Sequence, residues 1–292
     1  MMPARSITCI NEDNVSITLT DKFSPWELQT AEGLYEMNSP VNTLANTMSD
    51  GSTYQGSQVA QRNIILTLRD ADENHMDNRA LLYMVFKPKA KGQLRYTEND
   101  VTRIIDYYVE KAYIDAINRA RAATISLICP DPYFRDQDGI VVSMADWRGQ
   151  FEFEHEFTSG GEAFGYRNNE QIKTITNFNA DGIGLTITLT ANGSVTNPSI
   201  HHVEQQKHIY VGTNSKPFSM AAGDQLIIST HTNNKHIWKI SNGATVEVNE
   251  YLSEDSDFIQ LAYGDNNISY DAASGVGYLT VDIAYQYKYL GV

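Results

Sequence analysis

Alternation of apolar and polar residues constrains the fold of this 292-residue sequence more than any other feature. In residues 15–20 (VSITLT) and 185–190 (LTITLT), every second side chain is aliphatic. A period of two places successive side chains on opposite faces, as in a half-buried β-strand. Similar patterns recur along the chain, in residues 151–157 (FEFEHEF), 172–178, 225–230 and 235–240. The sequence therefore predicts a mainly β protein.

The C-terminal half, residues 137–292, predicts short strands and no helix. Asn242-Gly243 separates two strand-like segments and indicates a tight hairpin, because both residues tolerate positive φ. Residues 278–292 (YLTVDIAYQYKYLGV) alternate without a break. We predict a β-sandwich or jelly roll for 137–292. The terminal strand either stays in this domain or pairs back onto the N-terminal domain.

The N-terminal half, residues 1–136, is mixed. Residues 62–70 (RNIILTLRD) predict a strand, and residues 70–88 predict one helix that begins with acids and stops at Pro88. Residues 98–120 fit both a helix and a strand, and their aromatic and β-branched content favours a strand. Residues 124–129 (TISLIC) predict a further strand.

One segment of this half, residues 38–61, has almost no core pattern and is rich in Gly, Ser, Thr and Asn. It is too long for an ordinary turn. Two interpretations are open: a loose loop, or a long hairpin that protrudes and is ordered by a neighbouring subunit.

The motif CPDPYFRD at residues 129–136 could hold a reactive thiol or mark the end of a domain. A thiol nucleophile needs a base and a lowered pKa, whereas Cys129 has acids at Asp131 and Asp136 and no histidine within 20 residues. Pro130 and Pro132 lack a backbone donor and end the preceding strand. We interpret this motif as a domain junction at residues 136–137.

No other pattern predicts catalysis, a cofactor or a metal. The three glutamates of FEFEHEF share one face of one strand, and His201 and His202 of HHVEQQKH point to opposite faces. His231 and His236 flank a predicted hairpin and are the remaining metal candidate, with solvated histidines as the favoured interpretation. The two cysteines, Cys9 and Cys129, exclude a disulfide framework. We predict that the chain is not an enzyme.

The net charge is −14, of which residues 137–292 supply −10 (8 Lys and Arg against 18 Asp and Glu). An acidic surface repels phosphate backbones, so nucleic acid is not an expected partner. The longest apolar run has six residues, far short of a membrane span, and the first residues do not resemble a secretory signal. We expect a protein made in the cytoplasm. The 17 Tyr and 3 Trp leave sugar binding open as an alternative function.

The chain resembles the siphophage distal tail proteins of phages that infect Gram-positive bacteria. The resemblance is carried by a series of landmarks in order: SDG (49–51), Arg62 before NIILTL, LLYMVFKP (81–88), GQLRY (92–96), CPDPYF (129–134), NGSVTNPSI (192–200), AAGDQLIIST (221–230), SDFIQLAYGDNNISY (256–270) and YKYLGV (287–292).

This resemblance implies an N-terminal ring-forming domain with a belt hairpin at about 38–61 and a C-terminal galectin-like β-sandwich. It implies a homohexameric ring at the virion tail tip, assembled in the host cytoplasm. The ring would join the tail-tube protein to the tail-associated fibre or lysin protein, and in some relatives it also holds receptor-binding proteins. The alternative is a module that attaches the tail to cell-wall polysaccharide. The implied belt residues are Asn42, Thr43, Leu44, Asn46, Met48, Asp50, Tyr54 and Gln58, and the junction residues are Cys129, Pro130, Asp131, Pro132, Tyr133 and Phe134.

Overall fold

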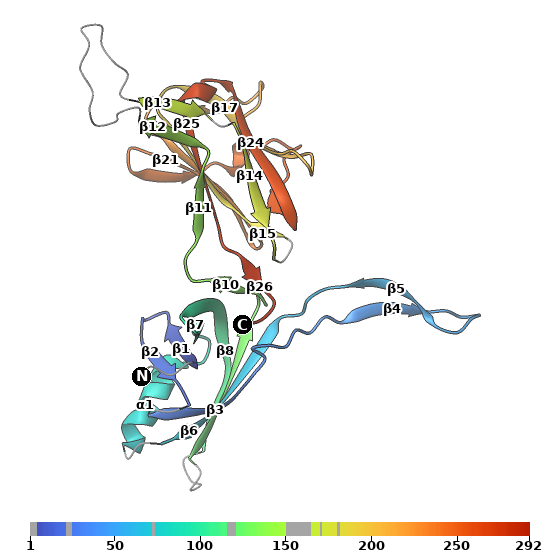
Figure 1. Cartoon of the computed structure of the whole chain (residues 1–292), viewed down its shortest axis with the longest axis vertical. Coiled ribbons are helices and arrows are strands. Elements are labelled where there is room, and N and C mark those ends of the chain that lie inside the picture. Colours follow the sequence, from blue (N-terminus) through green and yellow to red (C-terminus); the bar gives the residue numbers. More distant parts are fainter. Residues whose placement is uncertain are drawn as a thin grey trace. The chain divides into compact units, whose positions relative to one another are not determined.

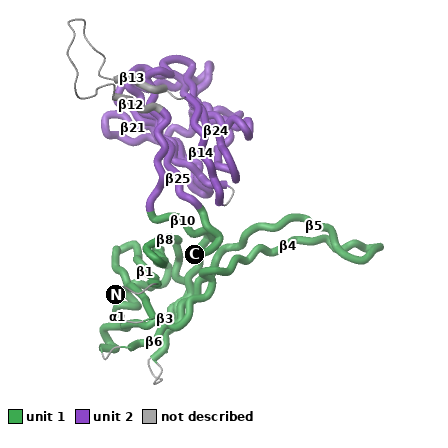
Figure 2. The backbone as a smooth tube through the Cα atoms, viewed as in Figure 1, with its two compact units in different colours: residues 1–137, 288–292 green, residues 138–287 purple. Residues whose placement is uncertain are grey.

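The strands of this chain are organised in two units with separate hydrophobic cores (Figure 2). The computed structural model describes residues 5–21, 25–71, 74–115, 121–149, 165–169, 171–179 and 182–292. Unit 1 contains Met1–Gln137 and Lys288–Val292, and unit 2 contains Asp138–Tyr287. The chain therefore passes from one unit to the other twice. The strand predicted at 151–157 lies outside the described residues.

Unit 1 contains most of the N-terminal half (Figure 1). Its elements are β1 (Arg5–Asn11), β2 (Ser16–Leu19), β3 (Trp26–Glu32), β4 (Val41–Ala45), β5 (Ser52–Ser57), β6 (Arg62–Asp70), α1 (His75–Val85), β7 (Lys91–Glu98), β8 (Val101–Ile114), β9 (Ala122–Cys129), β10 (Phe134–Asp136) and β26 (Lys288–Tyr289).

The main sheet of unit 1 has the strand order β2-β1-β7-β8-β9-β6-β3. Its two edge strands approach each other, because Thr20 forms an isolated bridge with Glu27 and the Leu28 amide donates to the Thr20 carbonyl at 2.8 Å. The sheet thus curls around a core that includes the buried side chains of Trp26, Tyr107 and Phe134. Burial of each such large apolar side chain stabilises the folded unit by about 1.5–3 kcal/mol.

Helix α1 packs against β1 and β2. Trp26 donates its indole N–H to the Asn78 carbonyl at 3.0 Å, and Asn11 donates to the Met84 carbonyl at 2.8 Å. The one predicted helix is therefore present, but it is shorter than residues 70–88. Asp70 belongs to β6 instead, where it pairs with Trp26, because strand pairing continues to that point.

Residues 98–120, which fitted two patterns, contain the long strand β8 between β7 and β9. The favoured interpretation as a strand is confirmed for Val101–Ile114, and residues 116–120 lie outside the described part. A bulge after Val109 shifts the register with β9. Ile105, Tyr107 and Val109 alternate into the core, so the period of two decided the structure.

Unit 2 contains strands and two short 3₁₀ helices (Figure 1). They are β11 (Ile140–Ser143), β12 (Ala145–Gly149), β13 (Gly165–Asn169), β14 (Ile172–Asn177), β15 (Ile183–Gly184), β16 (Thr186–Ala191), β17 (Val195–His202), β18 (Lys207–Tyr210), β19 (Ser219–Met220), β20 (Gln225–His231), β21 (Asn234–Ser241), β22 (Ala244–Glu247), η1 (Asn249–Tyr251), β23 (Gln260–Leu261), β24 (Gly264–Ser274), η2 (Val276–Tyr278) and β25 (Leu279–Tyr285).

Two antiparallel sheets form the body of unit 2, in the orders β11-β25-β16-β20-β21-β22 and β14-β24-β17-β18. Their inward side chains share one core, to which Ile187 and Ile283 contribute from the first sheet and Ile200 and Ile268 from the second. The predicted mainly β fold is confirmed, and unit 2 is a β-sandwich. The described part of unit 2 contains no α-helix, and its only helical segments are the 3₁₀ turns η1 and η2, each of three residues. Likeness to galectins in particular stays a prediction.

Local turn chemistry agrees with the sequence at the β21–β22 hairpin. Asn242 and Gly243 have φ values of 50° and 78°, so both adopt the left-handed conformation that a two-residue hairpin turn requires.

Residues 278–292 alternate without a break, but they form two strands, and the second pairs back onto unit 1. Strand β25 ends at Tyr285 in unit 2, and β26 begins at Lys288 in unit 1, where Tyr289 pairs with Phe134. The alternation continues across the break because both segments have one buried face, although each faces a different core. Among the described residues, no helix is long and apolar enough to span a membrane.

Candidate functional site: an exposed hairpin and its root

The segment without a core pattern forms an antiparallel hairpin of β4 and β5 that extends from the body of unit 1 (Figure 1). Residues 38–55 are all exposed, and none of them belongs to the core of unit 1. All eight predicted belt residues lie in this segment: Asn42, Thr43, Leu44, Asn46, Met48, Asp50, Tyr54 and Gln58. Their position in the hairpin is thus a structural fact, whereas their contact with a neighbouring copy stays a prediction.

Apolar side chains project from both faces of the hairpin. Leu44 pairs with Thr53, whereas Tyr54 pairs with Thr43 on the adjacent, opposite-facing position. Leu44 is 62% exposed and Tyr54 is 61% exposed. Met48, in the turn between the strands, is 98% exposed. Such a set of solvent-exposed apolar side chains on one projecting element indicates a contact surface.

Beyond the backbone pairing of β4 with β5, few side-chain hydrogen bonds stabilise the hairpin. The Asn46 amide donates to the Gly51 carbonyl at 3.2 Å, and the Thr53 hydroxyl donates to the Asn46 side chain at 3.2 Å. A two-stranded hairpin with no apolar face to bury is marginally stable in water. Its own contacts are therefore a weak source of order, and burial against another surface would add what they lack.

Arg62, which opens β6 at the root of the hairpin, is the best-connected side chain of this region. It is buried, and its guanidinium donates to the carbonyls of Pro132 at 2.8 Å, Leu34 at 3.1 Å and Glu36 at 2.9 Å. It also donates to the carbonyls of Gly33 and Leu290. Burial lowers the pKa of Arg62, and these acceptors compensate for part of the lost solvation.

Gly33 fixes the turn that leads from β3 toward the hairpin. Its φ of +81° favours glycine, and an added Cβ would clash with the Asn63 carbonyl. This close approach brings the residue 33–36 backbone onto Arg62. The hairpin thus leaves unit 1 from a rigid base.

The six junction residues lie near this base. Cys129 ends β9 opposite Arg62, Pro132 accepts from Arg62, and the Phe134 ring lies 5.0 Å from the Arg62 guanidinium carbon. Asp131 pairs with Lys288 at 3.3 Å, and the Lys288 ammonium also lies 5.2 Å from the Tyr133 ring. Pro130 is exposed and directly follows the last residue of β9. The motif therefore joins β9, the hairpin root and residues 288–292.

The chemistry of Cys129 does not favour a nucleophile. Burial raises the pKa of its thiol to about 12, with Asp106 and Asp131 adding to the rise and Arg62 opposing it. Burial also raises the pKa of Cys9. A thiol with a raised pKa carries almost no thiolate at neutral pH.

The histidines considered as metal ligands, His201 with His202 and His231 with His236, do not point toward one another. His202 is buried and its Nε2 contacts the Asn266 amide oxygen at 2.8 Å, while His201 lies on the outer face. His231 contacts Thr186, and His236 stacks on Trp238, so the two do not form a pair. In the part of the chain that the structure describes, no group of three His, Cys, Asp or Glu side chains is placed to hold a metal ion.

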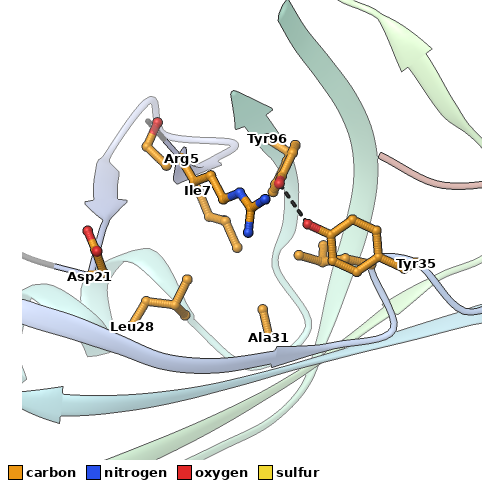
Figure 3. Close-up of a pocket in the computed structure, with 9 residues that line it drawn as sticks. Arg5, Ile7, Asp21, Leu28, Ala31, Tyr35 and Tyr96 are labelled. Carbon is orange, nitrogen blue, oxygen red and sulfur yellow. Dashed lines mark hydrogen bonds between the residues drawn. The ribbon is translucent and has the colours of Figure 1, made fainter. Parts of the chain in front are cut away.

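Unit 1 also has a recess of about 360 Å³ with apolar walls from Ile7, Leu28 and Leu34 (Figure 3). At its mouth, the Tyr35 and Tyr96 hydroxyls lie 2.8 Å apart, and Tyr96 donates to Glu98 at 2.9 Å. Arg5 pairs with Glu98 at 2.6 Å, and Asp21 is the other charged residue of the lining. The recess is suited to an apolar side chain.

Comparisons with known proteins agree with this architecture. Residues 182–289 match the family described as siphovirus-type tail component, C-terminal domain. The crystal structure of the SPP1 Dit (gp 19.1) protein, described as a paradigm of the hub adsorption apparatus in phages infecting Gram-positive bacteria, is similar with a TM-score of 0.68 at 12% identity, covering 97% of this chain and 99% of that one. A chain of the phage P2 baseplate in its activated conformation with Ca is similar with a TM-score of 0.59 at 10% identity, covering 99% of both chains.

No curated protein sequence matches the chain. At such low identities the two similar structures establish the fold alone. The family match shows that residues 182–289 are similar in sequence to the C-terminal domain of siphovirus-type tail components. The resemblance to siphophage distal tail proteins is confirmed.

Sequence reasoning missed the role of Arg62, which it used only as a landmark before the strand NIILTL. An arginine at the first position of an otherwise apolar strand was the available signal. Its acceptors lie 25 to 228 residues away in sequence, so no local pattern could identify them.

Proposed function

We propose that this chain is a structural hub protein of a siphophage tail, which assembles with identical copies into a hexameric ring. Each copy would place its β4–β5 hairpin against the next. The ring would join the tail-tube protein to the tail-tip fibre or lysin protein and hold receptor-binding proteins on its outside. It would lie at the virion tail tip after assembly in the host cytoplasm. We assign it no catalytic activity and no cofactor.

The exposed hairpin is the observation that carries this proposal. Fixing a residue's backbone costs about 1–2 kcal/mol of conformational entropy, and residues 38–55 are exposed and add nothing to the core of unit 1 that would offset that cost. Burial of Leu44, Met48 and Tyr54 against a second copy would offset it. A protruding element that contacts a different surface on the next copy generates a closed ring when the rotation closes. The number six rests on the resemblance to distal tail proteins.

The oligomeric state of hairpin variants tests this proposal. We expect the unaltered chain to form a species near six times 32.7 kDa. Deletion of residues 42–58 with a short Gly-Ser link should leave a folded monomer, since the hairpin lies outside the core of unit 1. Mass photometry or native mass spectrometry would measure the mass, and electron microscopy would show the ring.

A pair of matched substitutions sharpens the test. Met48→Asp places a charge on the hairpin, and Met76→Asp places the same charge on α1, where Met76 is 77% exposed. Only Met48→Asp should weaken assembly, and it should raise the protein concentration needed for half-maximal assembly at least tenfold. Hexamers that persist after the deletion, or that are equally sensitive to both substitutions, would contradict the role of the hairpin.

A further inference from the structure

Unit 2 has a second recess on the outer face of its β14-β24-β17-β18 sheet. In the register of this sheet, Ser199 of β17 pairs with Tyr210 of β18 and with Asp271 of β24. These three side chains form a row on the face opposite the buried residues Ile200 and Tyr270. The next row on the same face contains His201 of β17 and His208 of β18, which are paired with each other. The recess has a volume of about 410 Å³, within the range of small-ligand sites.

An aromatic cluster forms one wall of this recess. The Tyr210 ring lies 4.5 Å from the His208 ring and 5.4 Å from the His201 ring, the latter edge to face. Tyr210 is still 37% exposed. Its ring is therefore positioned by two neighbours while part of it stays open to a ligand. A tyrosine offers an apolar ring face together with a hydroxyl that donates or accepts.

Polar groups form the floor and the opposite side. Ser199 is only 6% exposed, and its hydroxyl lies 3.0 Å from Nε2 of His201. The loop with Thr213 and Asn214 borders the recess, and it is fixed by hydrogen bonds between Thr213 and Lys216. Asp271 is exposed at the rim. The recess thus presents hydroxyl, amide, imidazole and carboxylate groups around one aromatic wall.

The charge of this lining restricts the class of ligand. The described lining residues include no lysine or arginine and one carboxylate, Asp271. Anionic ligands such as phosphates would therefore be repelled. Burial, with a contribution from His208, lowers the pKa of His201, against an opposing effect of Asp271, so the imidazole is neutral near pH 7 and one ring nitrogen donates while the other accepts. A fully apolar ligand would cover the Asp271 carboxylate without replacing its contacts with water.

We propose that this recess binds a neutral saccharide, with one sugar ring against Tyr210 and its hydroxyls hydrogen-bonded to Asp271 and His201. A sugar ring has an apolar C–H face and hydroxyls that both donate and accept, which matches the aromatic wall and the mixed polar floor. The site goes beyond the ring-forming role, because it uses unit 2 alone and requires no neighbouring copy. A peptide with polar side chains is the competing occupant.

Binding of defined probes to the full chain tests this inference. The neutral probes are the methyl glycosides of glucose, galactose and N-acetylglucosamine, together with dextran and a galactan to separate a single sugar from a polymer. Glucose 6-phosphate and glucuronic acid are the anionic probes, and a serine-rich hexapeptide is the peptide probe. Saturation-transfer NMR and isothermal titration measure the binding. We expect saturable binding of at least one neutral glycoside and none of the anionic probes.

Two variants and their matched controls locate the site. Tyr210→Ala and Asp271→Asn should each weaken binding at least tenfold. Tyr263→Ala and Asp255→Asn change residue types of the same kind at exposed positions outside the recess and should leave binding within twofold. Asp271→Asn is nearly isosteric, so it tests the site even if Tyr210→Ala reduces stability.

Three results would overturn the inference: no binding of any neutral saccharide, tighter binding of an anionic or peptide probe, or equal effects of the site and control variants. The Met48→Asp variant separates this inference from the proposed hub role. A variant that no longer assembles should still bind the sugar, and a ring that does not bind would refute the saccharide site alone.

Discussion

Replacement of Arg62 should destabilise unit 1 far more than replacement of a surface arginine on the same strand. The Arg62 side chain donates to five backbone carbonyls, from Gly33, Leu34, Glu36, Pro132 and Leu290, and these carbonyls belong to three separate segments. Arg62→Met retains the aliphatic stem and removes every donor. The carbonyls would then have to find water or remain unpaired.

The magnitude follows from the number of acceptors and their access to water. A net hydrogen bond contributes about 0.5–1.5 kcal/mol, and a buried acceptor left unpaired costs about 1–3 kcal/mol. A recess of about 360 Å³ beside Arg62 admits water to some of these carbonyls, so we count three losses of about 1 kcal/mol. Loss of the contact with the Phe134 ring adds about 0.5–1 kcal/mol. We expect a total of about 3–5 kcal/mol.

Native-state hydrogen exchange measures this loss within unit 1 alone. The paired amides of β6 and β9 lie between β8 and β3, inside the sheet, and should exchange only when unit 1 unfolds. Arg62→Lys keeps the charge but has fewer donors and no planar fork. It should therefore lower the free energy of unfolding of unit 1 by about 1–2 kcal/mol.

Arg69→Met is the matched control for this prediction. Arg69 lies on β6 as well, but its side chain is 55% exposed and pairs with Glu27, an arrangement that contributes less than about 1 kcal/mol. If Arg62→Met and Arg69→Met destabilise unit 1 equally, Arg62 does not stabilise the hairpin root in the way we describe.

Two further substitutions test the cores of the two units. Tyr107→Phe should stabilise unit 1 by about 1 kcal/mol in urea unfolding, because the Tyr107 hydroxyl is buried with no hydrogen-bond partner among the described residues; a loss of stability would reveal a contact that we have missed. In unit 2, burial raises the pKa of Asp224, but hydrogen bonds from Lys239, Ser241 and the Ala221 amide outweigh this effect and hold the pKa at about 2. The ordinary value is 3.8, so the ionised form contributes about 2 kcal/mol above about pH 4 and loses it as the pH falls through about 2. Asp224→Asn should therefore reduce stability at pH 7 and have a much smaller effect near pH 2, and a difference independent of pH would contradict this.

The alternation of side chains predicted the strands well, because one face of nearly every strand is buried. Strand β8 shows this clearly, since its helical alternative would have placed Tyr107 and Val109 on different sides of a helix rather than in one core. The same signal failed at Gln286–Tyr287, because a period of two continues wherever both segments are half-buried. Alternation alone does not show whether two consecutive segments face the same core or different cores.

The candidate sites were predictable only where they depend on local sequence. The hairpin was one of two interpretations of residues 38–61, and both followed from the lack of a core pattern in one continuous segment. The outer recess of unit 2 could not be found this way, because Ser199 and Asp271 are 72 positions apart and meet only through the β17–β24 pairing. The sequence around Tyr210 does not distinguish a tyrosine in the wall of a recess from one on a flat sheet surface.

The return of the chain from unit 2 to unit 1 has a consequence for the order of events on the ribosome. The Leu290 and Gly291 carbonyls accept from Arg62 and Arg103, yet residues 288–292 are translated only after the whole of unit 2. A nascent chain must therefore hold the root of its hairpin unfinished until that later segment emerges. If copies assemble through this hairpin as proposed, a chain that is still being synthesised would lack a completed hairpin base until residues 288–292 have been translated.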